Sequence, residues 1–248
     1  MRLAAEGLPL ENHADKPFAV DALFGSDPTL LESHQCLSWT TTMQTLPLYH
    51  SVRTWFREKR QARRLIQWSK AGKPVPPPHI VKQLALKESL NSSGVRILVE
   101  TGTFRGDMVE AMRRHVDRIF SIELSETFAQ RAVDRFRNAS NVEIISGDSG
   151  EELRKLVPRL SGPTLFWLDG HYSGGTTAHG AEATPIFAEL ETVLKAEQRR
   201  HIVVIDDARC FGTDPAYPTL AELEQFVYSL RHDVRMTVQD DLIRILPV

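Results

Sequence analysis

Short apolar runs alternate with amphipathic segments along the chain from about residue 95 onward. The runs that predict buried strands lie at 96–100, 118–123, 142–146, 164–169 and 201–206. Helical patterns separate them at 107–116, 126–138, 150–156 and 183–197. Strands that alternate with helices in this way predict an α/β fold, with a parallel, doubly wound sheet and right-handed crossovers.

The C-terminal segment departs from this alternation. A helix is predicted at 220–230, and two apolar runs follow at 234–238 and 242–246 with only the tight 239–241 between them. Adjacent strands joined by so short a turn must be antiparallel. We therefore expect a mostly parallel, seven-stranded sheet that ends in an antiparallel hairpin.

The N-terminal part of the chain lacks this alternation of strand and helix patterns. Residues 1–45 show no sustained periodicity, and 48–70 has the pattern of an amphipathic helix with a strongly basic face. Prolines at 74 and 76–78 interrupt it before a second helical pattern at 80–90. We expect an N-terminal helical extension at 1–78 and the main domain at 79–248. The basic face either lies in solvent or binds an anionic partner.

The composition restricts the classes of binding partner, but it says little about the reaction. The 248 residues are 42% hydrophobic and carry a net charge of -2, which gives no general attraction to nucleic acid or to anionic lipid. No apolar run reaches the length of a membrane span, and residues 1–10 lack the apolar core of a signal peptide. Cys36 and Cys210 lack metal-ligand spacing. We expect a cytoplasmic protein without a nucleic-acid partner, and a homo-oligomer is left open.

A glycine-containing loop follows the first predicted strand and opens a helix. It reads Glu-Thr-Gly-Thr-Phe-Arg-Gly-Asp from Glu100 to Asp107 and lacks the Gly-x-Gly-x-x-Gly spacing of a dinucleotide site. Glycines allow a ligand to approach the backbone closely. The acids at both ends would repel a pyrophosphate and suit an ammonium or sulfonium ligand. The alternative is a tight strand-to-helix turn that binds nothing.

Further acids close the next two strands. Glu123 stands about twenty positions after the glycine loop, where a carboxylate can accept both hydroxyls of a ribose. Asp148 ends the third strand and could bind an adenine amino group. Either residue could instead cap the helix that follows it.

Three more carboxylates end the fourth and fifth predicted strands. Asp169 follows one strand, and Asp206 with Asp207 follows the other. Because ligands bind at the carboxyl ends of such strands, we expect these acids to converge there. They repel one another unless a cation is present, and their oxygens suit Mg²⁺, Ca²⁺ or Mn²⁺. Otherwise they serve as helix and loop caps.

Taken together, these motifs resemble the class I S-adenosylmethionine-dependent methyltransferases over roughly residues 80 to 248. The resemblance implies a Rossmann-like fold in which the glycine loop and its flanking acid hold the methionine end of the cofactor. The residues that it assigns to cofactor binding are Glu100, Gly102, Thr103, Gly106, Glu123, Asp148 and Ser149. Among them, Glu123 would hold the ribose, and Asp148 with Ser149 would lie near the adenine.

The acids after the fourth and fifth strands resemble those of metal-dependent O-methyltransferases of the catechol and macrolide-sugar type. By that resemblance, Asp169, Asp206 and Asp207 bind Mg²⁺, which holds the acceptor hydroxyl and lowers its pKa. The implied activity is methyl transfer from S-adenosylmethionine to a hydroxyl of a small molecule or sugar.

The general base has two candidates. His171 stands two residues after Asp169 and could take the proton of the hydroxyl, with Asp169 as the other catalytic candidate. The macrolide-sugar enzymes tend to carry an acid at the His171 position, so a hydrogen-bonding role is an equal alternative. The loop 172–180 is either a lid or a plain connection.

Other activities stay open at this point. A metal-independent methyltransferase would keep the cofactor and leave His171 or Asp169 to act alone. A non-catalytic protein that binds S-adenosylmethionine or a nucleotide would keep the fold without the chemistry. A metal-binding, hydroxylase-like branch of the same fold is a further alternative.

Overall fold

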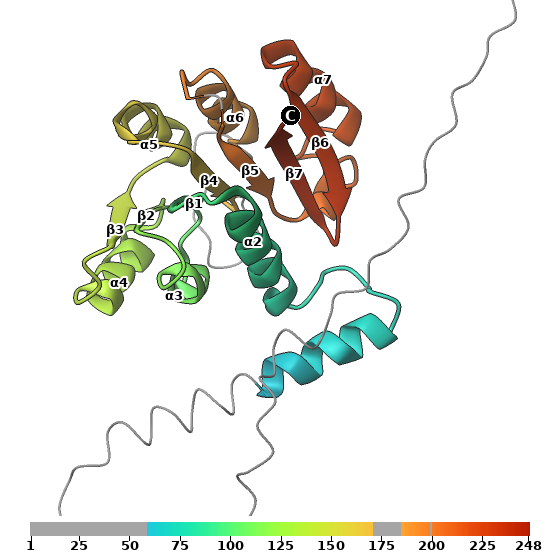
Figure 1. Cartoon of the computed structure of the whole chain (residues 1–248), viewed down its shortest axis with the longest axis horizontal. Helices are drawn as coiled ribbons and strands as arrows, with labels where there is room; N and C mark the ends of the chain where they lie inside the picture. The colour runs from blue at the N-terminus through green and yellow to red at the C-terminus, as the bar shows by residue number, and fades with distance from the viewer. Residues whose placement is uncertain (1–58, 171–184, 199) are drawn as a thin grey trace, which may run out of the picture. The chain divides into compact units, whose positions relative to one another are not determined.

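A computed structural model describes residues 59–170, 185–198 and 200–248, all within the unit Leu48–Val248 (Figure 1). Residues 59–70 form a helix, and the chain at 71–78 is non-helical as the prolines predict. The part of the predicted helix at 48–58 lies outside the described residues. The division of the chain at residue 78 stays a prediction.

A seven-stranded sheet forms the centre of the domain, with the order β3-β2-β1-β4-β5-β7-β6. The first five strands pair in parallel, and β7 pairs antiparallel with both β5 and β6. The strands are β1 Ile97–Thr101, β2 Arg118–Glu123, β3 Val142–Ser146, β4 Thr164–Leu168, β5 Ile202–Ile205, β6 Val234–Gln239 and β7 Leu242–Pro247. The strand order reverses between β1 and β4, which is where open sheets of this kind bind ligands.

Six labelled helices accompany the sheet. They are α2 His79–Ser93, α3 Asp107–Met112, α4 Glu126–Phe136, α5 Ser149–Leu156, α6 Ile186–Leu194 and α7 Leu220–Leu230. Helices α2, α3 and α4 lie on one face of the sheet, and α5, α6 and α7 lie on the other (Figure 1). No helix in the described part of the chain combines the length and the apolar character that a membrane span requires.

Strand pleating divides the interior into two apolar cores. In β4, Leu165 and Trp167 pack with residues of α2, α3 and α4, whereas Phe166 and Leu168 pack with residues of α5, α6 and α7. Successive side chains of a strand point to opposite faces, so a strand covered on both faces is apolar throughout. This explains why β4 and β5 appear in the sequence as continuous apolar runs.

The predicted fold is confirmed, and the differences lie at the ends of elements. Strands β2 and β3 and helix α7 have the predicted bounds. Helix α3 ends at Met112 rather than at residue 116, because His115 N bonds back to Met112 O in a tighter turn. The hairpin turn is shorter than predicted, since Asp240 and Asp241 both take positive φ and β6 continues to Gln239.

Candidate functional site

The glycine loop after β1 is closely packed between neighbouring strand ends. Gly102 has φ +85°, and a Cβ there would lie 2.5 Å from the carbonyl oxygen of Asp169. Its N–H donates to Ile122 O at 2.9 Å. Gly106 has φ +73° and forms the N-cap of α3. The loop therefore packs so closely against the ends of β2 and β4 that Gly102 has no space for a side chain.

Glu100 is buried in the middle of this edge. Ser121 Oγ donates to Glu100 Oε2 at 2.5 Å, and Ser121 Oγ also lies 2.6 Å from Thr103 Oγ1. Burial raises the pKa of Glu100 to about 8, although the Ser121 hydrogen bond acts in the opposite direction. Glu100 thus holds a proton at neutral pH unless a cation approaches it.

Glu123 and Asp148 already make local hydrogen bonds. Glu123 accepts the backbone N–H groups of Phe104 at 2.7 Å and Ser125 at 2.9 Å, one on each oxygen. A carboxylate has about four acceptor positions, so room for two ribose hydroxyls is left. Asp148 is the N-cap of α5 and accepts from Glu151 N at 3.2 Å. The capping role weighed for Asp148 is therefore present, beside a buried Ser149.

The three predicted metal ligands do come together. Asp169, Asp206 and Asp207 each offer an oxygen, and these atoms lie within 4.8 Å of one another. Trp167 and Val204 pack in the core next to α2, and two residues further on Asp169 and Asp206 continue toward the same face. The parallel pairing of β4 with β5 thus brings both strand ends to one place.

Mutual repulsion and burial perturb these acids strongly. Burial and then the Asp206 carboxylate raise the pKa of Asp169 well above its usual range. Burial raises the pKa of Asp206 to about 6. Burial also acts to raise the pKa of Asp207, but Lys82 and Arg209 outweigh it, and the net shift is downward. Perturbed carboxylates gathered at a strand edge are typical of functional sites.

Sequence reasoning missed Lys82, which reaches this cluster from α2. Its Nζ donates to Asp206 Oδ2 at 2.5 Å and to Asp207 Oδ1 at 3.1 Å. The side chain of Lys82 is only 13% exposed. Burial lowers its pKa, but the two carboxylates outweigh burial and the pKa is raised. A signal was available, because Lys82 stands four residues before the fully buried Leu86 on the inner side of the helix.

A second cation, Arg209, contacts the cluster from the short turn that follows β5. Arg209 Nη1 donates to Asp207 Oδ1 at 2.8 Å and also to Asp241 in the β6–β7 turn. Ala208 N donates to Asp241 O at 2.9 Å. The hairpin turn therefore fixes the backbone that carries Asp206 and Asp207.

Glu189 of α6 is a further buried acid that was not predicted. It is completely buried near Thr101 and Gly170, and neither of its oxygens has a hydrogen-bond partner of ordinary geometry among the described residues. Burial raises the pKa of Glu189 to about 7, and the nearby Ser149 and Thr101 hydroxyls offset only part of this. Its position among Ile186, Leu190 and Val193, on the apolar side of α6, was the available signal.

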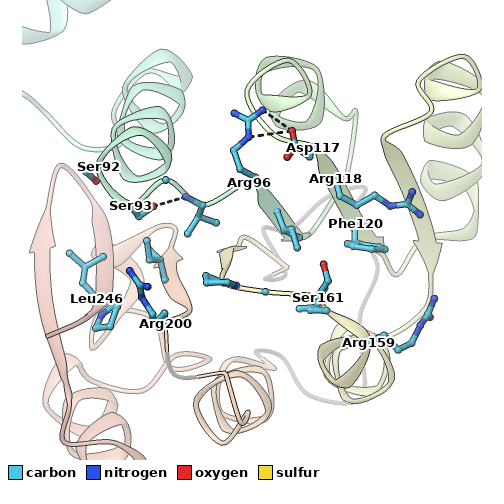
Figure 2. A pocket seen from close by; sticks show the side chains of 18 residues that line it. Ser92, Ser93, Arg96, Asp117, Arg118, Phe120, Arg159, Ser161, Arg200 and Leu246 are labelled. Carbon is cyan, nitrogen blue, oxygen red and sulfur yellow. Dashed lines mark hydrogen bonds and ion pairs between the residues drawn. The ribbon is translucent and has the colours of Figure 1, made fainter.

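A hollow of about 940 Å³ lies at the opposite, amino-terminal edge of the strands (Figure 2). It is lined in part by four arginines, Arg96, Arg118, Arg159 and Arg200. Arg96 pairs with Asp117 at 2.7 Å, and both of these side chains are more than half exposed. Arg118 pairs with Glu143 at 2.8 Å, with side chains 46% and 37% exposed. The hollow contains none of the predicted site residues.

Some predictions fall outside the described residues. His171, the loop 172–180 and the start of the predicted helix at 183 belong to residues 171–184. The roles weighed for His171 therefore stay predictions. Gly102, Gly106, Glu100, Asp169 and Asp206 do gather at one edge, which is the arrangement that the sequence predicted.

The fold of the chain is similar to that of several solved methyltransferases. The O-methyltransferase TomG from Streptomyces achromogenes, solved with SAM, superposes with a TM-score of 0.51 at 19% identity, covering 83% of this chain and 100% of that one. An O-methyltransferase from Bacillus cereus with SAH has a TM-score of 0.51 at 16% identity, covering 75% and 90%. The SAH-bound methyltransferase PaMTH1 from Podospora anserina has a TM-score of 0.50 at 13% identity, covering 86% and 100%. No protein-family model matches the chain, and no curated protein matches its sequence.

Proposed function

Because the chain has the fold of the class I S-adenosylmethionine-dependent methyltransferases and resembles O-methyltransferases among them, we propose that it transfers a methyl group from S-adenosylmethionine to a hydroxyl of a small molecule or sugar. The observation that carries the proposal is the convergence of Asp169, Asp206 and Asp207 beside Gly102. A group of carboxylates next to the glycine loop could hold and deprotonate an acceptor hydroxyl.

The residues at the β1 and β2 ends suit the cofactor. Glu100, Gly102, Thr103 and Gly106 would hold its methionine end, where the buried acid can pair with an ammonium group. Glu123 has acceptor capacity left for the ribose, and Asp148 with Ser149 would lie near the adenine. The bound cofactor would supply an electrophilic methyl group on its sulfonium.

The contribution of the chain itself would be positioning and proton control. Holding the acceptor oxygen in line with the methyl group accounts for much of the rate enhancement in such transfers. Asp169 is one proposed base, and burial together with the neighbouring Asp206 carboxylate raises its pKa, which makes its carboxylate a stronger base. His171 stays the other proposed base.

Mg²⁺ bound at Asp169, Asp206 and Asp207 would give the metal-dependent form of the proposed activity. Carboxylate oxygens are the donors that a hard divalent cation prefers. Lys82, however, already donates to two of these three acids. This contact favours the metal-independent form of the proposed activity, and Mg²⁺ binding stays a prediction.

The proposal is tested by calorimetric titration of the full chain with S-adenosylhomocysteine, in Mg²⁺ and then in EDTA. We expect micromolar affinity in both conditions. Asp206→Ala should then leave this affinity nearly unchanged and abolish methyl transfer in an acceptor screen with radiolabelled cofactor. If S-adenosylhomocysteine does not bind in either condition, the methyltransferase proposal is wrong and a non-catalytic role takes its place.

A further inference from the structure

We propose that Lys82 is the resident cation of the acidic cluster, and that its ammonium group takes the place of the divalent metal that Asp169, Asp206 and Asp207 would otherwise bind. The inference goes beyond the proposed methyl transfer, which does not depend on whether the cation is a metal or a lysine.

The first argument is the occupancy of the oxygen atoms. Asp206 Oδ2 accepts from Lys82 Nζ at 2.5 Å, and Asp206 Oδ1 accepts from Asp207 N at 2.7 Å. Asp207 Oδ1 accepts from both Lys82 and Arg209. Within the described residues, three of the four carboxylate oxygens of this pair are therefore already hydrogen-bonded.

The second argument is that the two cations exclude one another. Mg²⁺ binds oxygen at about 2.0–2.1 Å, so an ion on Asp206 Oδ2 would lie within about 5 Å of Lys82 Nζ. Repulsion between a divalent ion and an ammonium at that distance, away from bulk water, is several times the thermal energy. A metal can bind there only after Lys82 leaves.

The third argument is that Lys82 is held in place. Helix α2 is anchored in the core through Leu86 and Leu90, which are almost entirely buried. The Lys82 side chain, 13% exposed, lies between that helix and the ends of β4 and β5. Its withdrawal would leave Asp206, with a side chain 2% exposed, next to two other acids without this counter-charge.

Metal binding to the full chain tests the inference directly. Mn²⁺ is titrated while the electron paramagnetic resonance signal of the free ion is recorded, for the wild type and for Lys82→Gln. We expect no wild-type site with a dissociation constant below about 1 mM. We expect Lys82→Gln to bind one Mn²⁺ at least about 30-fold more tightly, because the competing charge is gone.

Three further variants separate charge from other effects. Lys82→Arg keeps a cation at the site and should bind Mn²⁺ no better than the wild type. Lys87→Gln removes a charge from the same helix away from the cluster and should also leave Mn²⁺ binding unchanged. Asp206→Asn combined with Lys82→Gln should remove the gained site, which would assign it to the cluster.

The outcomes distinguish this inference from the proposed function. Wild-type binding of one Mn²⁺ at micromolar concentration, lost in Asp206→Asn, overturns the inference, and so does a Lys82→Gln protein that is folded but gains no site. If Lys82→Gln does not fold, the wild-type titration with its Asp206→Asn control still decides. S-adenosylhomocysteine binding, measured on the same samples, reports separately on the methyltransferase proposal.

Discussion

The two edges of the sheet, formed by the amino and the carboxyl ends of the parallel strands, differ in how far their charged side chains are exposed to solvent. At the amino-terminal edge, Arg96 and Asp117 form an exposed ion pair beside an open hollow. At the carboxyl-terminal edge, Glu100, Asp206 and Glu189 are buried, and burial raises the pKa of each. Exposed ion pairs change the free energy of unfolding little, whereas a buried carboxylate lowers it by several kcal/mol unless it is paired. The carboxyl-terminal edge, where these buried acids gather, is therefore the candidate site.

Two glycines with similar backbone conformations, one at each edge, give the largest expected difference in stability. Gly102 at the carboxyl edge has φ +85°, and a Cβ added there would meet the Asp169 carbonyl oxygen at 2.5 Å, whereas Gly94 at the amino edge has φ +68° with nothing within 4 Å. We expect Gly102→Ala to destabilise the fold by about 3 kcal/mol or more, since a clash adds to the left-handed strain. Gly94→Ala should lower the free energy of unfolding by only about 1 kcal/mol, from the left-handed strain alone. Urea denaturation of both variants measures the difference, and equal losses would contradict the close packing of the glycine loop.

Removing one cation from each edge is the next comparison. Lys82→Gln should lower the free energy of unfolding by about 3 kcal/mol at pH 7, because it leaves buried carboxylates without their partner. Arg96→Gln breaks a solvated pair and should not shift the urea midpoint measurably. Millimolar Mg²⁺ should restore stability to Lys82→Gln alone. A loss of similar size in both variants would show that the carboxyl edge is no more dependent on charge pairing than the amino edge.

Glu189 should show the cost of a buried acid through its pH dependence. Its folded-state pKa, about 7, lies above the ordinary value of 4.5. The folded protein thus holds the proton more tightly, and stability falls as pH rises from about 4.5 to about 7 and then levels off. Glu189→Gln should be more stable than the wild type by about 2–3 kcal/mol at pH 8 and about equal to it at pH 4. Thermal unfolding across this pH range measures the effect, and a gain that does not vary with pH would assign it to packing.

The smallest expected effect concerns Glu100 and the cofactor. Since burial raises the pKa of Glu100 to about 8, binding of a ligand ammonium should release its proton below that pH. The affinity for S-adenosylhomocysteine should then rise with pH, by at most about tenfold per unit, up to about pH 8. Calorimetry in buffers of different ionisation enthalpy measures the protons released. Glu100→Gln is the control, and proton release that persists in it would assign the effect to another group.

The positions of the acids and of the glycine loop could be predicted from the sequence, because they depend on where the strands end. Acids after β4 and β5 were expected to converge because parallel neighbours finish at the same edge, and Asp169, Asp206 and Asp207 do so. The same reasoning placed Glu100 and Gly102, at the end of β1, beside these acids. In each case a local pattern and one rule of sheet geometry were sufficient.

Contacts set by helix packing were not predictable in the same way. Lys82 and Asp206 are 124 positions apart, and their contact depends on how α2 packs across the sheet. The periodicity of α2 shows only that a lysine stands on its inner side, without indicating which acid it meets. Glu189 likewise appeared as one charge in an apolar stripe, and its depth depends on the closure of α6 over β1 and β4.

The place of β7 between β5 and β6 has a consequence for biosynthesis. Asp206 and Asp207 leave the ribosome before the turn that contains Asp241, which holds Arg209 and the backbone of Ala208. A nascent chain that has exposed β1 to β5 can thus assemble the glycine loop while its acidic cluster still lacks the support of the hairpin. If the chain has the proposed activity, the loop that would hold the methyl donor should therefore form earlier during translation than the fully supported acidic cluster.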